Sequence, residues 1–381
     1  MKIASIDTYV LFYPEPNDYS SQRCALLVKV TTSDGVEGWG EGIAQFPEAT
    51  KAAVPIVEGL FEVVKNENPL EIEKIWHKMR DHTWWYGRSG IANFAVSAID
   101  IALWDIKGKV LGAPLYELLG GKVTEKLPAN ACIHVNHPTP EETVEVLEGY
   151  IHDQGYQSCK LGFAKKGPSP IGKVSPDIDV KFVADLRSAL GDTPDIMVDA
   201  GNGVKWDVPT AVRTTQRMME SNIRWMEEPL YPTDILGYKE LRSKVGVSIA
   251  SGEREWNVEG YQALLDTDTV DVFGVDPGRV EGITGYMKIQ YHISAKRRFI
   301  NAHAWSTAIT TAASLHCSHA SNNSIVFELK PIPGPAQFDL VSEPIVQNQG
   351  WVAASDRPGL GIDVQLKTVE KYCVQHMTFK G

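Results

Sequence analysis

The chain has 381 residues, too many for one small domain, and its apolar content of 43% is too high for a disordered protein. The formal net charge of −11 argues against non-specific nucleic-acid binding, but it does not exclude an anionic substrate, because a local metal ion can override the global charge. The five cysteines are scattered without a CxxC pair, and no signal-peptide core or run of about 18 apolar residues occurs. We therefore expect a soluble, cytoplasmic protein of about two domains, with no nucleic-acid or membrane partner.

The first third of the chain changes from strand signals to helix signals. Residues 25–30 and 36–41 have the pattern of two strands joined by a turn at Ser33-Asp34-Gly35. Residues 48–119 carry a helical pattern, clearest at 94–105, where apolar residues recur at i, i+3, i+4 and i+7. Strands followed by helices are typical of an α+β module, which we place at residues 1–125.

In residues 126–330, short apolar runs recur and each is followed by a polar residue. Successive polar residues are 23 to 28 positions apart, and they are Asp199, Glu227, Glu253, Asp276, His303 and Glu328. A strand, a helix and their two loops need at least about 20 residues. The spacing therefore predicts a (β/α) barrel, in which the carboxyl ends of the strands share one mouth and bring these six side chains together.

The tail, residues 331–381, returns to turn-like and strand-like segments such as 347–352 and 358–362. We expect it to lie back against the first domain and to complete it.

Three of the predicted strand ends carry carboxylates, namely Asp199, Glu227 and Glu253. Oxygen ligands without Cys or His suit Mg²⁺ better than zinc or copper, and a divalent cation would relieve the repulsion among three like charges. The alternative is that each acid caps a helix or pairs with a basic residue.

The next strand ends carry the groups expected for proton transfer. A carboxylate such as Asp276, bonded to one imidazole nitrogen of His303, would make the other nitrogen a better proton acceptor. Glu328 would face the substrate as a hydrogen-bonding acid, or pair with a nearby base. Lys160, at the end of an earlier strand, could steady a carboxylate or enolate, or be a solvated loop lysine.

With these residues in place, the chain resembles the enolase superfamily, mandelate racemase subgroup, over essentially its whole length. The matching segments are Gly38-Trp39-Gly40-Glu41, 98–108, Val198-Asp199-Ala200, Glu227-Glu228-Pro229, Gly252-Glu253, Asp276 with His303, Phe327-Glu328 and Pro358-Gly359-Leu360-Gly361. The resemblance implies an α/β fold: a modified (β/α)₇β barrel with an N-terminal α+β capping domain completed by the C-terminal tail. It also implies one Mg²⁺, abstraction of the proton α to a carboxylate, and a homo-oligomer.

One position departs from the family pattern, which often has Lys-X-Lys on the second barrel strand. Here the corresponding positions are Lys160 and Gly162, so the second lysine base is missing. This favours dehydration of a small sugar acid to a 2-keto-3-deoxy acid by one base over racemisation, which needs a group on each face of the α-carbon. Three loop lysines are the candidates for a replacement: Lys165, Lys166 and Lys173.

The resemblance also assigns substrate specificity to the cap. The aromatic and polar cap residues that could cover the barrel mouth are Tyr13, Tyr19, Arg23, His82, Trp84, Trp85, Tyr86 and Arg88. Three further readings stay open: a sugar-acid cycloisomerase, a racemase or epimerase of a hydroxy acid, and a barrel retained as a binding or scaffold protein.

Overall fold

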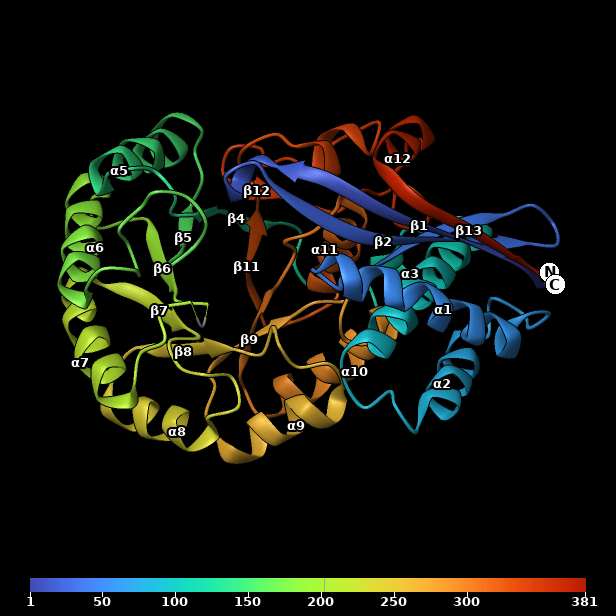
Figure 1. Cartoon of the computed structure of the whole chain (residues 1–381), viewed down its shortest axis with the longest axis horizontal. Helices are drawn as coiled ribbons and strands as arrows, with labels where there is room; N and C mark the ends of the chain where they lie inside the picture. The colour runs from blue at the N-terminus through green and yellow to red at the C-terminus, as the bar shows by residue number, and fades with distance from the viewer. Residues whose placement is uncertain (202) are drawn as a thin grey trace.

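Two sheets organise the chain, and the computed structural model describes residues 1–201 and 203–381 of it. A four-stranded sheet has the order β13-β1-β2-β3, and a nine-stranded sheet runs from β11 through β4 to β12 and closes through a β11–β4 pairing. Figure 1 shows the two sheets side by side, with the chain termini together at the far end of the smaller one. The smaller sheet and its helices form the cap, and the larger sheet forms the barrel.

The cap is an antiparallel sheet covered by helices. Its strands are β1 (Ile3–Glu15), β2 (Ser21–Thr32), β3 (Glu37–Gly42) and β13 (Cys373–Lys380), and its helices are α1 (Pro47–Val64), α2 (Ile72–Thr83), α3 (Ile91–Leu111) and α4 (Leu115–Leu118). Glycines on β3 allow α3 to approach closely, since a Cβ added at Gly40 would lie 1.9 Å from the carbonyl oxygen of Ala98. This contact explains the glycine-rich pattern of the β3 sequence.

Among the described residues, the barrel has eight parallel strands connected by seven α-helices. The strands are β4 (Leu127–His134), β5 (Ser158–Gly162), β6 (Asp195–Asp199), β7 (Ile223–Glu227), β8 (Ser248–Ser251), β9 (Val272–Val275), β10 (Phe299–Ala302) and β11 (Ser324–Leu329). The helices are α5 (Pro140–Glu148), α6 (Pro176–Leu190), α7 (Val208–Met218), α8 (Ile235–Lys244), α9 (Val258–Thr267), α10 (Gly282–Ala295) and α11 (Ala308–His319). The predicted capped (β/α)₇β barrel is confirmed.

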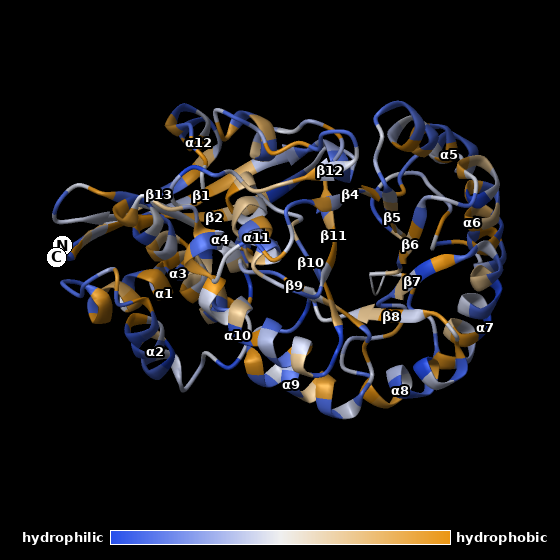
Figure 2. Cartoon of the chain, turned by 180° about the vertical axis from the view of Figure 1, so that it is seen from behind, coloured by the Kyte–Doolittle hydropathy of each residue, from blue (hydrophilic) through white to orange (hydrophobic). Residues whose placement is uncertain are grey.

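The helices surround the barrel with one face inward. On α7 the buried residues include Ala211, Val212, Thr215 and Met218, which recur at helical spacing. Figure 2 shows the same alternation of hydrophobic and hydrophilic segments along the outer helices. In the described part of the chain, no helix is long and apolar enough to cross a membrane.

The tail is divided between the two sheets. Strand β12 (Trp351–Val352) pairs with barrel strand β4, whereas β13 pairs with cap strand β1, and α12 (Leu366–Tyr372) lies between them in sequence. The tail therefore completes the cap, as expected, but its first part also extends the barrel sheet. The domain boundaries at residues 125 and 330 stay a prediction.

A carboxylate of the cap binds the start of a barrel helix. Glu41 on β3 accepts hydrogen bonds from the hydroxyls of Ser306, Thr307 and Thr310, and from the backbone N–H groups of Thr307 and Thr310 at the start of α11. A negative charge at a helix N-terminus is favourable, and Glu41 is fully buried. This contact fixes the cap relative to the barrel mouth.

Candidate active site

A cavity of about 450 Å³ lies where the cap covers the carboxyl ends of the barrel strands. This volume falls within the range of about 300–1,000 Å³ that is common for small-molecule sites. Four of the predicted site residues line it: Lys160, Asp199, Glu253 and His303. The other three, Glu227, Asp276 and Glu328, are buried and contact these lining residues directly.

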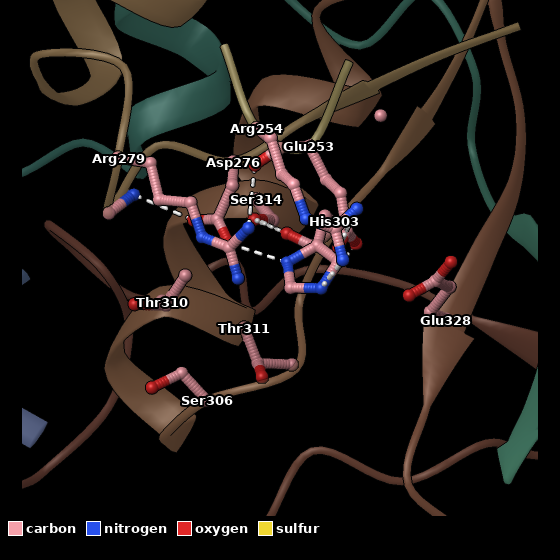
Figure 3. Close-up of polar contacts among 12 residues, drawn as sticks. Glu253, Arg254, Asp276, Arg279, His303, Ser306, Thr310, Thr311, Ser314 and Glu328 are labelled. Atoms are coloured by element: carbon pink, nitrogen blue, oxygen red, sulfur yellow. Dashed lines mark hydrogen bonds and ion pairs between the residues drawn. The ribbon is translucent and has the colours of Figure 1, made fainter. Parts of the chain in front are cut away.

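His303 and Asp276 form a dyad at adjacent strand ends. Asp276 follows β9 and His303 follows β10, and the Nδ1 of His303 lies 2.6 Å from the Oδ2 of Asp276. The other oxygen of Asp276 accepts the N–H of Gly278 at 2.8 Å, so the carboxylate is held on both sides. Figure 3 shows His303 between Asp276 and Glu253, whose Oε2 is 3.2 Å from the Nε2 of His303. The arrangement suits an imidazole that takes up a proton at Nε2.

Lys160 is a buried cation between two carboxylates. Its Nζ is 3.1 Å from Glu227 Oε1 and 2.5 Å from Glu328 Oε1, and Glu328 also accepts from Asn301 at 2.5 Å. Burial opposes the ammonium charge, but attraction from Glu227 and Glu328 outweighs it and raises the pKa of Lys160 well above its usual value. Lys160 is therefore a permanent positive charge at the base of the cavity.

The strand positions of two of these residues differ from the sequence prediction. Lys160 was expected at a strand end, but β5 continues two residues further, to Gly162. Glu328 was expected to end its run, but β11 continues to Leu329. Both side chains consequently lie deeper in the barrel, where they contact each other. Glu328 contacts Lys160 and is not among the described residues that line the cavity.

The three predicted metal ligands lie on consecutive strands. Asp199 and Glu227 are register partners on β6 and β7, and Glu253 follows β8. Burial raises the pKa of Glu227, and the charges of Asp199 and Glu253 raise it further against the opposing effect of Lys160. Asp199 and Glu253 are thus both close enough to Glu227 to repel its charge.

In this structure each acid is engaged by a basic side chain. Asp199 lies 3.8 Å from Lys165, and Glu253 lies 3.3 Å from Arg254 in addition to its contact with His303. Within residues 1–201 and 203–381, no group of three His, Cys, Asp or Glu side chains is already arranged to hold a metal ion. Three hard oxygen donors at one mouth nevertheless fit a divalent cation such as Mg²⁺, provided that the side chains turn toward it.

Only part of the predicted cap set reaches the cavity. Tyr13 and Arg23 line it. Trp84 and Arg88 instead line a second cavity between α2 and the barrel, and Trp85 and Tyr86 are exposed. The aromatic segment at 84–86 follows α2, whereas the segments over the mouth are the β1–β2 connection and the residues after β3.

Sequence reasoning missed a second histidine–aspartate pair in the cavity. His134 ends β4, its Nδ1 lies 2.7 Å from the Oδ1 of Asp18, and its ring stacks on Trp305 at 4.0 Å. Burial lowers the pKa of His134 to about 4, so the imidazole is neutral near pH 7. The apolar run at 131–133, followed by the polar His134, carried the same signal as the six strand ends that were recognised.

Two of the three loop lysines reach the cavity. Lys165 and Lys166 line it, whereas Lys173 donates to the carbonyl of Gly167. A Cβ added at Gly162 would lie 2.8 Å from the Cε of Lys165, so the Lys165 side chain covers the glycine at the position of the missing lysine.

The fold and the site together define a capped barrel enzyme with a histidine–aspartate dyad beside a set of carboxylates. Residues 18–120 match the mandelate racemase/muconate lactonizing enzyme N-terminal domain, and residues 142–368 match the enolase C-terminal domain-like family. The chain therefore belongs to the mandelate racemase subgroup of the enolase superfamily, as the resemblance indicated.

The relatives whose names state an activity include both dehydratases and cycloisomerases. A D-gluconate/D-galactonate dehydratase of Picrophilus torridus is 29% identical over 97% of this chain and 93% of its own length. A D-galactarolactone cycloisomerase of Agrobacterium fabrum is 28% identical over 98% of this chain and 99% of its own. The crystal structure of a 3,6-anhydro-D-galactonate cycloisomerase from Zobellia galactanivorans superposes with a TM-score of 0.88 at 28% identity, over 98% of this chain and 100% of the other.

Proposed function

We propose that this protein is a Mg²⁺-dependent dehydratase that converts a small sugar acid to a 2-keto-3-deoxy acid. The observation that carries the proposal is a cavity lined by His303, Asp199, Glu253 and Lys160, with Asp276 bonded to His303 and Glu227 paired with Lys160 directly behind its wall. The dehydratase among the relatives supports the same reaction class.

The proposed site residues divide the work. Asp199, Glu227 and Glu253 would hold Mg²⁺, which when bound supplies positive charge to the substrate carboxylate and lowers the cost of charge that develops there. Lys160 adds a second, fixed positive charge near the proposed position of the substrate carboxylate, and Glu328 holds Lys160 in place.

The proton is moved by the dyad. His303 Nε2 takes the α-proton of the substrate, and Asp276 stabilises the resulting imidazolium through Nδ1. The imidazolium then returns this proton to the departing β-hydroxyl, which leaves as water. The enol that remains takes up the keto form, so the net change is the loss of one water from the sugar acid.

The reaction is tested by following keto-acid formation from a panel of aldonates and aldarates, and by ¹H NMR of α-proton exchange in deuterated water. We expect turnover with at least one acid, loss of turnover after EDTA treatment and its return on addition of Mg²⁺. His303→Asn should abolish exchange, while His152→Gln, an exposed histidine on the outside of the barrel, should leave it unchanged. Exchange retained in His303→Asn would assign the base elsewhere.

A cycloisomerase is the second candidate, favoured by the likeness to two cycloisomerases. It would use the same proton abstraction, but product NMR separates the reactions because only dehydration loses a hydroxyl. A scaffold protein would bind the acid without exchange at the α-carbon. The expected homo-oligomer and cytoplasmic location stay predictions, the first of which light scattering can check.

A further inference from the structure

The wall of the cavity formed by His134 lies across the barrel mouth from Glu253, whereas Asp199, on β6, is two strands away from it. In the closed order of eight strands, β4 is four strands away from β8 in either direction, and Glu253 follows β8 while His134 ends β4. A substrate whose carboxylate lay beside Glu253 would direct its carbon chain toward His134. We call His134, Asp18, Arg23 and Trp305 the far wall.

Asp18 fixes which nitrogen of His134 carries the hydrogen. Although burial opposes ionisation, the hydrogen bond from His134 and the charge of Arg23 hold the pKa of Asp18 well below its usual value. An ionised Asp18 can only accept, so the Nδ1 of His134 must be the donor in the 2.7 Å contact. The Nε2 of the neutral ring is then a hydrogen-bond acceptor, and it has no hydrogen-bond partner among the described residues.

The positive charges of the far wall already have a partner. Arg23 donates from Nε to Asp18 Oδ2 at 2.8 Å, its Nη2 lies at the same distance, and its guanidinium lies 5.5 Å from the ring centroid of Trp305. Lys166 lies 4.0 Å from Asp18 and is largely exposed, so solvent screens its charge. Lys165, which lies beside His134 at Gly162, is 3.8 Å from Asp199. Asp18 itself is buried and also accepts the hydroxyl of Ser21 at 2.6 Å.

We propose that the far wall selects an uncharged, hydroxylated chain end, so that the substrate is an aldonate rather than an aldarate, with His134 Nε2 accepting a hydrogen bond from a chain hydroxyl. This inference rests on the proposed function and adds which class of sugar acid the site takes. A second carboxylate at this wall would lose its water without gaining an unpaired cation, and it would face the acceptor nitrogen of His134. A hydroxyl donates to that nitrogen and leaves no buried polar atom unpaired.

The first experiment compares an aldonate with the aldarate of the same length and hydroxyl configuration, which differ only at the far end. With the Mg²⁺-loaded wild-type protein, we expect kcat/KM for the aldonate to exceed that for the aldarate by about 100-fold or more. Equal or preferred turnover of the aldarate would overturn the inference and leave the proposed dehydration standing. Absence of both keto acid and α-proton exchange with every aldonate and aldarate of the panel would overturn the proposed function itself.

The second experiment tests His134 directly. His134→Gln should lower kcat/KM for the aldonate by about 10- to 100-fold, chiefly through KM, and should narrow the ratio between the two acids. A merely structural effect would lower kcat/KM for both acids in proportion and leave the ratio between them unchanged. His152→Gln is the matched control outside the site. An unchanged ratio in His134→Gln, with the thermal unfolding midpoint recorded for each variant, would overturn the role given to this residue.

Discussion

The substitution Asp276→Asn tests whether the dyad holds His303 in the form that accepts a proton. One oxygen of Asp276 accepts the backbone N–H of Gly278, and the other lies 2.6 Å from the Nδ1 of His303. An asparagine at this fully buried position would keep its oxygen toward Gly278 and turn its NH₂ group toward His303. Nδ1 would then have to accept, and the hydrogen would move to Nε2, where the lone pair is needed.

Asp276→Asn should therefore remove the ability of His303 to accept the proton while leaving the shape of the dyad unchanged. General-base catalysis contributes about 10²- to 10⁴-fold, so both kcat and the rate of α-proton exchange should fall by that factor. The assay is NMR in deuterated water, with Asp266→Asn on the exposed side of α9 as the matched control. Exchange within about threefold of wild type would refute this reasoning, because the tautomer of His303 would then be set by another contact.

Three further predictions concern stability, each measured by urea unfolding. Lys160→Met leaves two buried carboxylates unpaired and should cost about 3–5 kcal/mol; an unchanged midpoint would contradict the ion pairs. Gly40→Ala places a methyl group 1.9 Å from the carbonyl oxygen of Ala98 and should cost about 1–3 kcal/mol; an unchanged midpoint would contradict the close contact of β3 with α3. Burial raises the pKa of Asp100 to about 7, so the folded state binds this proton more tightly than the unfolded chain. The contribution of Asp100 to stability should therefore fall by about 2 kcal/mol between about pH 5.5 and pH 8, and the stability difference between the wild type and Asp100→Asn should change by that amount over this range.

The barrel and its site could be predicted because strand order in the sequence becomes order around a mouth. A residue that ends an apolar run, such as Glu227 or His303, is placed by the period of the βα unit alone. The depth of a side chain within the mouth was harder to predict from the sequence. Lys160 and Glu328 lie deeper than expected, because strand ends are set by pairing across the sheet rather than by the local run.

The contribution of the cap to the site could not be predicted from the sequence in the same way. Asp18 and Arg23 come near His134 only after β1 and β2 pair and the connection between them crosses the mouth, a contact that spans more than 100 residues of sequence. The aromatic segment at 84–86 had a composition suited to sugar binding, yet its position after α2 keeps it away from the cavity. Composition indicates what a segment can bind but not where the fold places it.

The two halves of the molecule therefore contribute different steps, and buried contacts hold them in register. The groups proposed for proton transfer and charge stabilisation belong to the barrel, whereas Asp18 and Arg23, which define the far wall with His134, belong to the cap. One such contact is the hydrogen bond that Glu41 of the cap accepts at the start of α11. A second is a buried ion pair of 2.6 Å between Glu15 of the cap and Lys330, which follows the last barrel strand. Because both contacts flank the mouth, a change in the cap sequence can alter which chain end is accepted while the dyad keeps its geometry. Within the proposed function, substrate choice and proton transfer can thus vary separately in this fold.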